Sequence, residues 1–154
     1  MSELKRTLVE NIFYPKHSPR TQSAEYKRVH HKLVYDMNEP CWICGITHQD
    51  VLQLPLADQR AWEMETHHDE LEWAAANGVD LRLITTDFPE IMEDHDKLRH
   101  WLDSEGNMLV LCAMHHRAAR TGIHMITYPA WKLQRWQGKD WTFITQKDKE
   151  LITG

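Results

Sequence analysis

Hydrophobic and polar residues alternate along this chain in short blocks, and the blocks predict a mixture of short helices and strands. Residues 23–37 carry apolar side chains near helical spacing behind Ser23, a suitable N-cap, so they are predicted to form a helix. Residues 61–68 alternate apolar and polar side chains, which is typical of a strand. The apolar run 107–112 follows a Ser-Glu-Gly turn and predicts a second strand.

The remaining blocks predict helices. Residues 69–77 read as a helix ended by Gly78, and residues 86–103 as a longer one with Asp87 as its cap and a proline in its first turn. Two further helices are expected at 113–120, ended by a glycine, and at 128–136. The first 22 residues show little periodicity and are expected to form an irregular arm, which leaves residues 23–154 as the domain.

Composition limits the class of protein. The chain has 154 residues, of which 42% are hydrophobic, which suits one buried core and is too small for two domains. Its apolar runs are short and interrupted by charge, so neither a membrane span nor a secretory signal is expected. These features favour a soluble, cytoplasmic protein.

Charge is divided unevenly along the chain. The net charge of −5 disfavours a nucleic-acid partner, because neutralisation of phosphates supplies much of the affinity in such complexes. However, residues 50–105 hold 15 acidic and 4 basic residues, whereas both flanking parts are net positive. A basic face is therefore still compatible with the overall charge.

The three cysteines indicate a metal site. Cys41 and Cys44 form a CxxC pair followed by glycine, and Cys112 lies far along the chain. Three cysteines cannot close a disulfide framework, whereas a CxxC turn lets two thiolates converge on one ion. The odd number requires a fourth ligand of another type.

The segments CWICG (41–45), ETHH (65–68), GNMLVLC (106–112) and CAMHHR (112–117) occur in an order that resembles the HNH, or ββα-metal, nucleases. The resemblance is to the branch in which zinc clamps the nuclease hairpin, and it covers roughly residues 41–120. It implies an α+β fold with a small zinc-clamped ββα-metal core and additional helices.

GIHMITYPAW, after this core, is similar to the tails of phage-encoded HNH proteins. The acidic segment 69–106 is longer than the family's connecting loop, and a solvated insertion is its simplest interpretation.

The resemblance implies two sets of metal ligands. The structural zinc ligands would be Cys41, Cys44, Cys112 and His115. The alternative is that Cys112 is a buried core cysteine and His115 a surface residue. A catalytic Mg²⁺ or Mn²⁺ would be held by His67 and His116, and this ligand pair also suits Ni²⁺ or Zn²⁺.

The resemblance also implies the catalytic residues. His68 would be the general base, since imidazole can accept a proton near neutral pH. Asn107 would orient the histidine or brace the loop. Successive strand residues point to opposite sides, so His67 and His68 cannot both face one ion from a regular strand. The simplest assignment is that His67 is the metal ligand and His68 the base. A solvent-facing strand end is the alternative for the pair.

Other polar residues have open interpretations. Glu65 could accept a hydrogen bond from His67 or could be a solvated charge. His124 lies outside the core motif; contact with DNA or with the metal site is one interpretation, and a structural role is the simpler one.

Phosphate contacts are assigned to four basic residues after the second strand: Arg117, Arg120, Lys132 and Arg135. The alternative is that Trp131, Leu133 and Trp136 form a core beneath a solvated basic face.

The expected function is that of a metal-dependent HNH endonuclease that hydrolyses DNA phosphodiester bonds, in the host cytoplasm if the chain is phage-encoded. A catalytically silent, zinc-stabilised DNA- or protein-binding module of a DNA-processing complex is the alternative. A single-site enzyme would need a homodimer or two independent events for a double-strand cut. A protein partner for the acidic segment is a further hypothesis.

Overall fold

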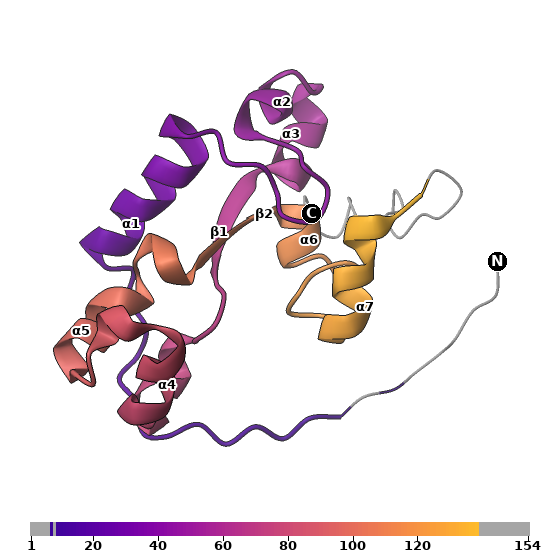
Figure 1. The fold of residues 1–154 in the computed structure, drawn as a ribbon. Coiled ribbons are helices and arrows are strands. Elements are labelled where there is room, and N and C mark those ends of the chain that lie inside the picture. Colours follow the sequence, from indigo (N-terminus) through magenta and orange to yellow (C-terminus); the bar gives the residue numbers. More distant parts are fainter. Residues whose placement is uncertain (1–6, 8, 139–154) are drawn as a thin grey trace.

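Two short antiparallel strands form the centre of the fold (Figure 1). β1 spans Met64–His68 and β2 spans Met108–Cys112, with Met64 opposite Cys112 and His68 opposite Met108. This computed structural model describes residues 7 and 9–138. Both strands were predicted, but the first begins later than expected because residues 61 and 62 complete a helix.

The two sides of β1 have different neighbours. Buried and half-buried residues alternate along the strand, with Met64, Thr66 and His68 on the buried side. On this side lies α1 (Ala24–His31), whose Tyr26 donates its hydroxyl hydrogen to the carbonyl oxygen of Thr66 at 3.0 Å. The other side carries Glu65 and His67, because side chains alternate along a strand.

The predicted N-terminal helix is present and has the predicted cap. The side chain of Ser23 accepts a hydrogen bond from the backbone of Tyr26, which satisfies a free N–H group at the helix start. The chain continues beyond α1 as a π-helix, η1 (Lys32–Asp36). Val29, Leu33 and Val34 are buried in the main core, which packs around the hairpin.

Other elements flank the hairpin. α2 (His48–Leu52) and α3 (Leu56–Trp62) precede β1 and were not predicted. After β2, the predicted helix at 113–120 is reduced to α6 (Ala113–His116). The predicted helix at 128–136 comprises α7 (Tyr128–Leu133) and η5 (Gln134–Trp136).

The acidic segment between the strands differs from the prediction. η2 (Trp73–Gly78) replaces the first helix, and the long helix is divided between three elements. These are α4 (Leu81–Asp87), η3 (Pro89–Ile91) and α5 (His95–Leu102). The long helix is interrupted because Met92 and Glu93 have positive φ angles of 54° and 52°, which right-handed helices do not allow.

A small core holds this segment together. Ile91, Leu98 and Trp101 are buried against one another, apart from the main core. Asp94 caps α5 by accepting a hydrogen bond from the backbone of Lys97 at 2.9 Å. The segment therefore behaves as a packed insertion, and η4 (Glu105–Asn107) returns the chain to β2.

The described part of the N-terminal arm has no helix or strand, as expected, but it is attached to η2. Asn77 donates to the carbonyl oxygen of Lys16, and the indole of Trp73 donates to that of Ser18. Tyr14 donates to a carboxylate oxygen of Glu72 at 3.2 Å. Figure 1 shows this arm running past the α4 end of the fold.

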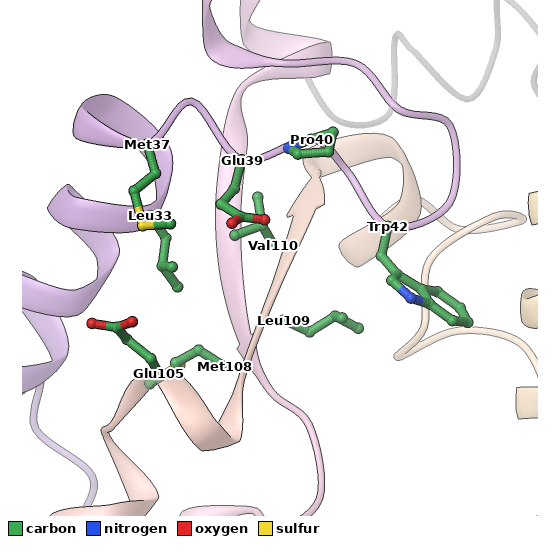
Figure 2. Close-up of a pocket in the computed structure, with 9 residues that line it drawn as sticks. All are labelled: Leu33, Met37, Glu39, Pro40, Trp42, Glu105, Met108, Leu109 and Val110. Carbon is green, nitrogen blue, oxygen red and sulfur yellow. The ribbon is translucent and has the colours of Figure 1, made fainter.

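A pocket of about 280 Å³ lies beside β2, and its lining includes Leu33, Trp42 and Leu109 (Figure 2). No histidine lines it. Across the described residues, no helix is both long enough and apolar enough to cross a bilayer. Helices dominate around one small antiparallel sheet, in agreement with the predicted α+β class.

Candidate metal centres

The CxxC segment forms a tight turn attached to β2. The amide of Gly45 donates to the carbonyl oxygen of Cys41 at 2.8 Å, and Gly45 has a φ of 78°, a conformation that glycine adopts without strain. The amide of Trp42 donates to the carbonyl oxygen of Val110 at 3.0 Å. These bonds hold the two cysteines of the turn beside the end of the strand that carries Cys112.

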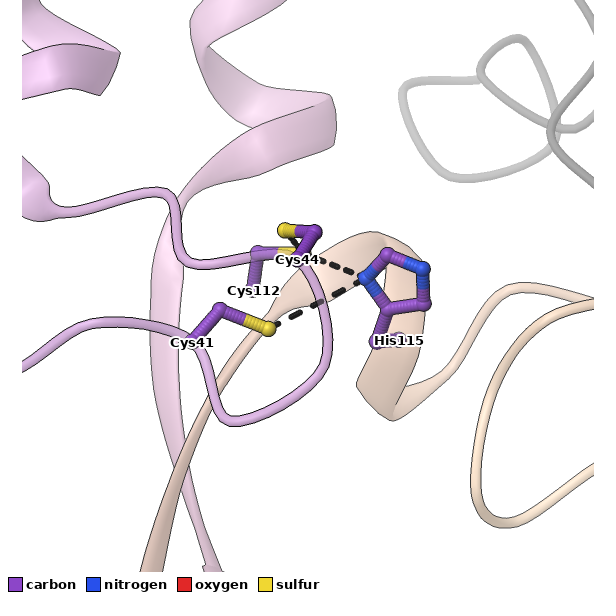
Figure 3. Close-up of side chains that lie close together, drawn as sticks. All are labelled: Cys41, Cys44, Cys112 and His115. Atoms are coloured by element: carbon purple, nitrogen blue, oxygen red, sulfur yellow. Dashed lines mark hydrogen bonds between the residues drawn. The ribbon is translucent and has the colours of Figure 1, made fainter. Parts of the chain in front are cut away.

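Cys41, Cys44, Cys112 and His115 meet in one cluster, called here the cysteine–histidine cluster (Figure 3). Their ligand atoms all lie within 4.8 Å of one another. The Sγ atoms of Cys44 and Cys112 are 3.8 Å apart, and Nδ1 of His115 is 3.2 Å from Sγ of Cys112. Two sulfurs bound to one zinc ion at tetrahedral angles are separated by about 3.8 Å, given Zn–S bonds of about 2.3 Å.

The surroundings suit a structural metal ion. Cys41, Cys112 and His115 are buried, and Cys44 is exposed. Hydrogen bonds from the other two cysteines lower the pKa of Cys41 and so favour its thiolate, whereas the pKa values of Cys44 and Cys112 are raised, so these two thiols would lose their protons as metal binds. Three sulfurs and one imidazole nitrogen complete a tetrahedral set with no position left for substrate. The cluster that the sequence predicted can therefore bind a metal such as zinc.

The short helix α6 carries ligands of two different clusters. Its first amide, of Ala113, donates to the carbonyl oxygen of Glu63 at 2.8 Å. The indole of Trp131 donates to the carbonyl oxygen of His115 at 2.7 Å, which fixes the other end. Neighbouring residues on a helix point about 100° apart, so His115 faces the cysteines while His116 faces elsewhere.

His116 faces His67 and His124, and the three form the histidine cluster. Their ligand atoms lie within 4.8 Å of one another, and the ring centroids of His67 and His124 are 4.7 Å apart. His67 and His116 are half-buried, and His124 is exposed, so the cluster opens to solvent. The sequence predicted His67 and His116 as partners, whereas for His124 a structural role was preferred to contact with the metal site.

A turn after α6 places His124. The amide of Ile123 donates to the carbonyl oxygen of His115 at 3.0 Å, and that of His124 donates to the carbonyl oxygen of His116. A Cβ atom at Gly122 would lie only 2.8 Å from backbone atoms of Ala118, so only glycine fits there. From the sequence, Gly122 was predicted only to end a helix. A glycine at this point also lets the chain fold back toward α6, and this is the signal that could have placed His124 beside His116.

Glu65 orients His116. Its Oε2 atom lies 2.5 Å from Nδ1 of His116, and its Oε1 atom accepts from Nε of Arg117 at 2.8 Å. A proton on Nδ1 leaves Nε2 of His116 free to bind an ion, which is how carboxylates commonly fix a ligand histidine. Glu65 was considered as a partner of His67, but it contacts His116 instead.

Electrostatics favour the uncharged form of two members of the histidine cluster, His67 and His124. Burial, together with the neighbouring His116 and His124, lowers the pKa of His67 to about 3. Burial and His116 also lower the pKa of His124. Neutral imidazole is the form that binds metal, so two of the three rings are already in the required state at neutral pH.

His68 lies on the opposite side of β1 from His67. Its Nε2 atom is 2.9 Å from Oδ1 of Asp103, whose Oδ2 accepts from the hydroxyl of Ser23 at 2.5 Å. The side chain is only 4% exposed, and burial lowers the pKa of His68 against the opposing effect of Asp103. His68 therefore does not belong to the histidine cluster, and Asp103 is a partner that the sequence did not predict.

Asn107 is completely buried behind the end of β1. Its Oδ1 atom accepts hydrogen bonds from the amides of Glu70 and Leu71, at 3.0 and 3.1 Å. Its Nδ2 atom donates to the carbonyl oxygens of Leu71 and Leu102. The four bonds brace the loop after β1, which is one of the two roles considered for this residue.

The basic residues assigned to phosphate contact have different surroundings. Arg117 pairs with Glu63 and Glu65, and Arg120 is exposed after α6. The guanidinium of Arg135 lies 4.2 Å from the ring centroid of Trp42, and Nζ of Lys132 lies 6.0 Å from it. Cation–π contacts of this kind orient the cations without neutralising them.

Part of the proposed tryptophan core is absent. Trp131 is buried and stacks on Trp42 with centroids 5.6 Å apart. By contrast, Leu133 and Trp136 are exposed, so the alternative in which all three form a core holds only for Trp131.

Comparisons of the chain with protein-family models, curated proteins and solved structures found no match. The functional conclusion therefore depends on the arrangement of the side chains.

Proposed function

We propose that this protein is a metal-dependent endonuclease of the HNH type that hydrolyses DNA phosphodiester bonds and carries a structural zinc ion. The supporting observation is the position of His116, next to the cysteine–histidine cluster in sequence and within 4.8 Å of His67 and His124 in space. His67 of β1 and His116 of α6 thus lie close together beside the cysteine–histidine cluster, whose residues are suited to bind a metal ion. That cluster brings together the CxxC turn, the end of β2 and the helix α6.

The histidine cluster suits a catalytic ion by its donors and its exposure. Such an ion would neutralise the charge that develops on the scissile phosphate and the leaving oxygen. His67, His116 and His124 would hold it, and Glu65 keeps Nε2 of His116 available. Imidazole ligands favour Zn²⁺ or Ni²⁺ over Mg²⁺ and Mn²⁺, which prefer oxygen donors. The third histidine strengthens this preference relative to a two-histidine site.

His68 is proposed as the base that takes a proton from the attacking water. The contact between its Nε2 atom and Asp103 leaves Nδ1 as the nitrogen with a free lone pair. Water would then form the new bond to phosphorus, the bond to the 3′ oxygen would break, and that oxygen would be protonated from solvent. Asn107 would act by bracing the loop after β1 rather than by touching substrate.

A second function is favoured by one observation. The side chain of His68 is 4% exposed and lies on the side of β1 opposite the histidine cluster, which suits a structural residue better than a base that must reach a water beside the ion. In that case the protein would be a zinc-stabilised DNA- or protein-binding module without nuclease activity. Under this alternative, the histidine cluster could still bind an ion, but no hydrolysis would follow.

Cleavage of supercoiled plasmid by zinc-loaded protein distinguishes the two functions. Mn²⁺, Ni²⁺, Zn²⁺ and Mg²⁺ would be added in turn, and wild type would be compared with His67→Ala and His68→Ala at matched zinc content. His95→Ala, an exposed histidine of α5, is the control. We expect ion-dependent nicking by wild type and control that both other variants lose. No nicking with any ion favours the binding module, and nicking by His68→Ala would show that another group is the base.

A further inference from the structure

A groove of about 450 Å³ runs between α1 and the outer edge of β1. Gln22, Lys27, His30 and Tyr35 line it from the helical side, and Glu65 and His116 line it from the other side. Its volume lies within the range of roughly 300–1,000 Å³ that is typical of small-molecule sites. Neither the cysteine–histidine cluster nor His68 borders it.

The groove is continuous with the histidine cluster. His116 belongs to both, and Glu65 lines the groove while bonding to Nδ1 of His116. A molecule that occupies the groove would therefore have one end beside the ion-binding nitrogens. In a nuclease, the group next to the ion is the scissile phosphate, and the adjoining space must take a neighbouring nucleotide.

The lining has the chemistry of a nucleotide site. The ring of Tyr35 is 47% exposed and is held by edge contacts, with centroids 5.9 Å from His30 and 4.7 Å from His48. An exposed ring of this kind offers a surface on which a base can stack. Lys27 is exposed and can pair with a phosphate, and the amide of Gln22 can donate to and accept from a base edge.

We infer that this groove binds an unpaired nucleotide adjacent to the scissile phosphate, so that the preferred substrate is single-stranded or locally unpaired DNA. This inference rests on the proposed function. A groove of this size takes one nucleotide, and a paired base would have to leave its stack to enter it. That step costs a few kcal/mol in duplex DNA and least where the base is already unpaired.

Binding is measured first, without cleavage. A fluorescently labelled single-stranded oligonucleotide and the matching duplex would be titrated with zinc-loaded protein in Ca²⁺, and fluorescence anisotropy recorded. Lys27→Ala and Tyr35→Leu change the groove, and Lys97→Ala, an exposed lysine of α5, is the control. We expect tighter binding of the single strand, weakened at least about fivefold by Tyr35→Leu, in line with the loss of one stacked base. Equal binding of both DNA forms, or no effect of either groove variant, would overturn the inference.

Cleavage then separates the two proposals. The single strand, the duplex and a duplex with one unpaired nucleotide would be incubated with the ion that supports nicking. We expect cuts beside the unpaired nucleotide, at least about tenfold faster than in the perfect duplex, from the few kcal/mol cost of unstacking. Groove-dependent binding without any cleavage would support the groove and reject the nuclease. Equally fast cutting of all three would reject the groove and keep the nuclease.

Discussion

Nε2 of His116 lies 3.1 Å from Nε2 of His124, although eight residues and a tight turn separate them along the chain. Two nitrogens bound to one ion at tetrahedral angles are about 3.3 Å apart, given bonds of about 2.0 Å. The pair is therefore already spaced as two ligands of a single ion. His67 completes the group from β1, so three different elements must be in place before this geometry exists.

Replacing Cys44 by serine should remove the structural ion. Cys44→Ser exchanges a strong zinc ligand for a weak one at an exposed position, so it creates no cavity. We expect the tightly bound zinc of the cysteine–histidine cluster, about one equivalent, to be lost and the unfolding temperature to drop sharply, because structural zinc contributes directly to folding free energy. Elemental analysis and calorimetry would measure both, with His95→Ala as the control. Retention of one tightly bound zinc would refute the assignment of these four ligands.

Replacing His124 should weaken a second ion selectively. In protein whose cysteine–histidine cluster is loaded with zinc, His124→Ala is expected to lower the affinity for added Ni²⁺ or Zn²⁺ by about 100-fold or more. A loss of this size is larger than the roughly 10–100-fold decrease in metal affinity that follows when a residue that only orients a ligand is removed. Isothermal titration would measure it, and His95→Ala should bind like wild type. Unchanged affinity in His124→Ala would limit the site to two histidines.

Gly122 should be needed for the same ion without being a ligand. A Cβ atom there would approach the backbone of Ala118 to 2.8 Å, and backbone cannot yield as a side-chain end can. Gly122→Ala is therefore expected to displace His124, to weaken the second ion and to leave the first zinc in place. Titration of both ions would show this. Gly138→Ala is the control, because no atom lies within 4 Å of the added Cβ.

Acid should destabilise the protein through His67. Its pKa is about 3 in the folded chain and near 6.5 when unfolded, so between these values the unfolded chain binds a proton that the folded chain does not. The free energy of unfolding should thus fall as pH falls, by about 1.4 kcal/mol per such histidine from pH 7.5 to 5.5. Denaturant unfolding of zinc-loaded protein without a second ion would measure it. His67→Gln should have a smaller slope, and an equal slope would contradict this origin.

Asn107 should contribute stability whether or not the protein is a nuclease. Asn107→Ala leaves the amides of Glu70 and Leu71 without their acceptor, and a buried unsatisfied group costs about 1–3 kcal/mol. We expect a loss of at least that size in urea unfolding. Hydrogen exchange should become faster at these two amides in particular. A variant as stable as wild type would mean that another group takes over the bonds.

The sequence predicted the cysteine–histidine cluster well because its ligands lie in two short local patterns. CxxC and Cys-x-x-His each bring two ligands to one side of a turn, so only one long-range contact had to be inferred. The first strand followed from alternation, and the second from a short apolar run after a turn. By contrast, α2 and α3 were missed because they are only five and seven residues long, too short for a clear helical period, and the first two residues of the first predicted strand belonged to a helix.

The partners of the two neighbouring histidines were harder to predict. Asp103 reaches His68 only because the acidic segment is broken at Met92 and Glu93 and then returns to the hairpin. His124 reaches His116 only because Gly122 lets the chain fold back against Ala118. Both contacts depend on backbone conformations that leave no periodic signal in the sequence.

The adjacency of His115 and His116 on α6 has a thermodynamic consequence. An ion bound by the cysteine–histidine cluster would restrict the motion of α6, the helical turn that carries His116. Less conformational entropy would then be lost when the three residues of the histidine cluster bind their own ion. The two equilibria are then linked, and linkage is reciprocal: each ion should increase the affinity for the other by the same factor. Removal of zinc from the cysteine–histidine cluster should therefore also weaken the binding of an ion by the histidine cluster.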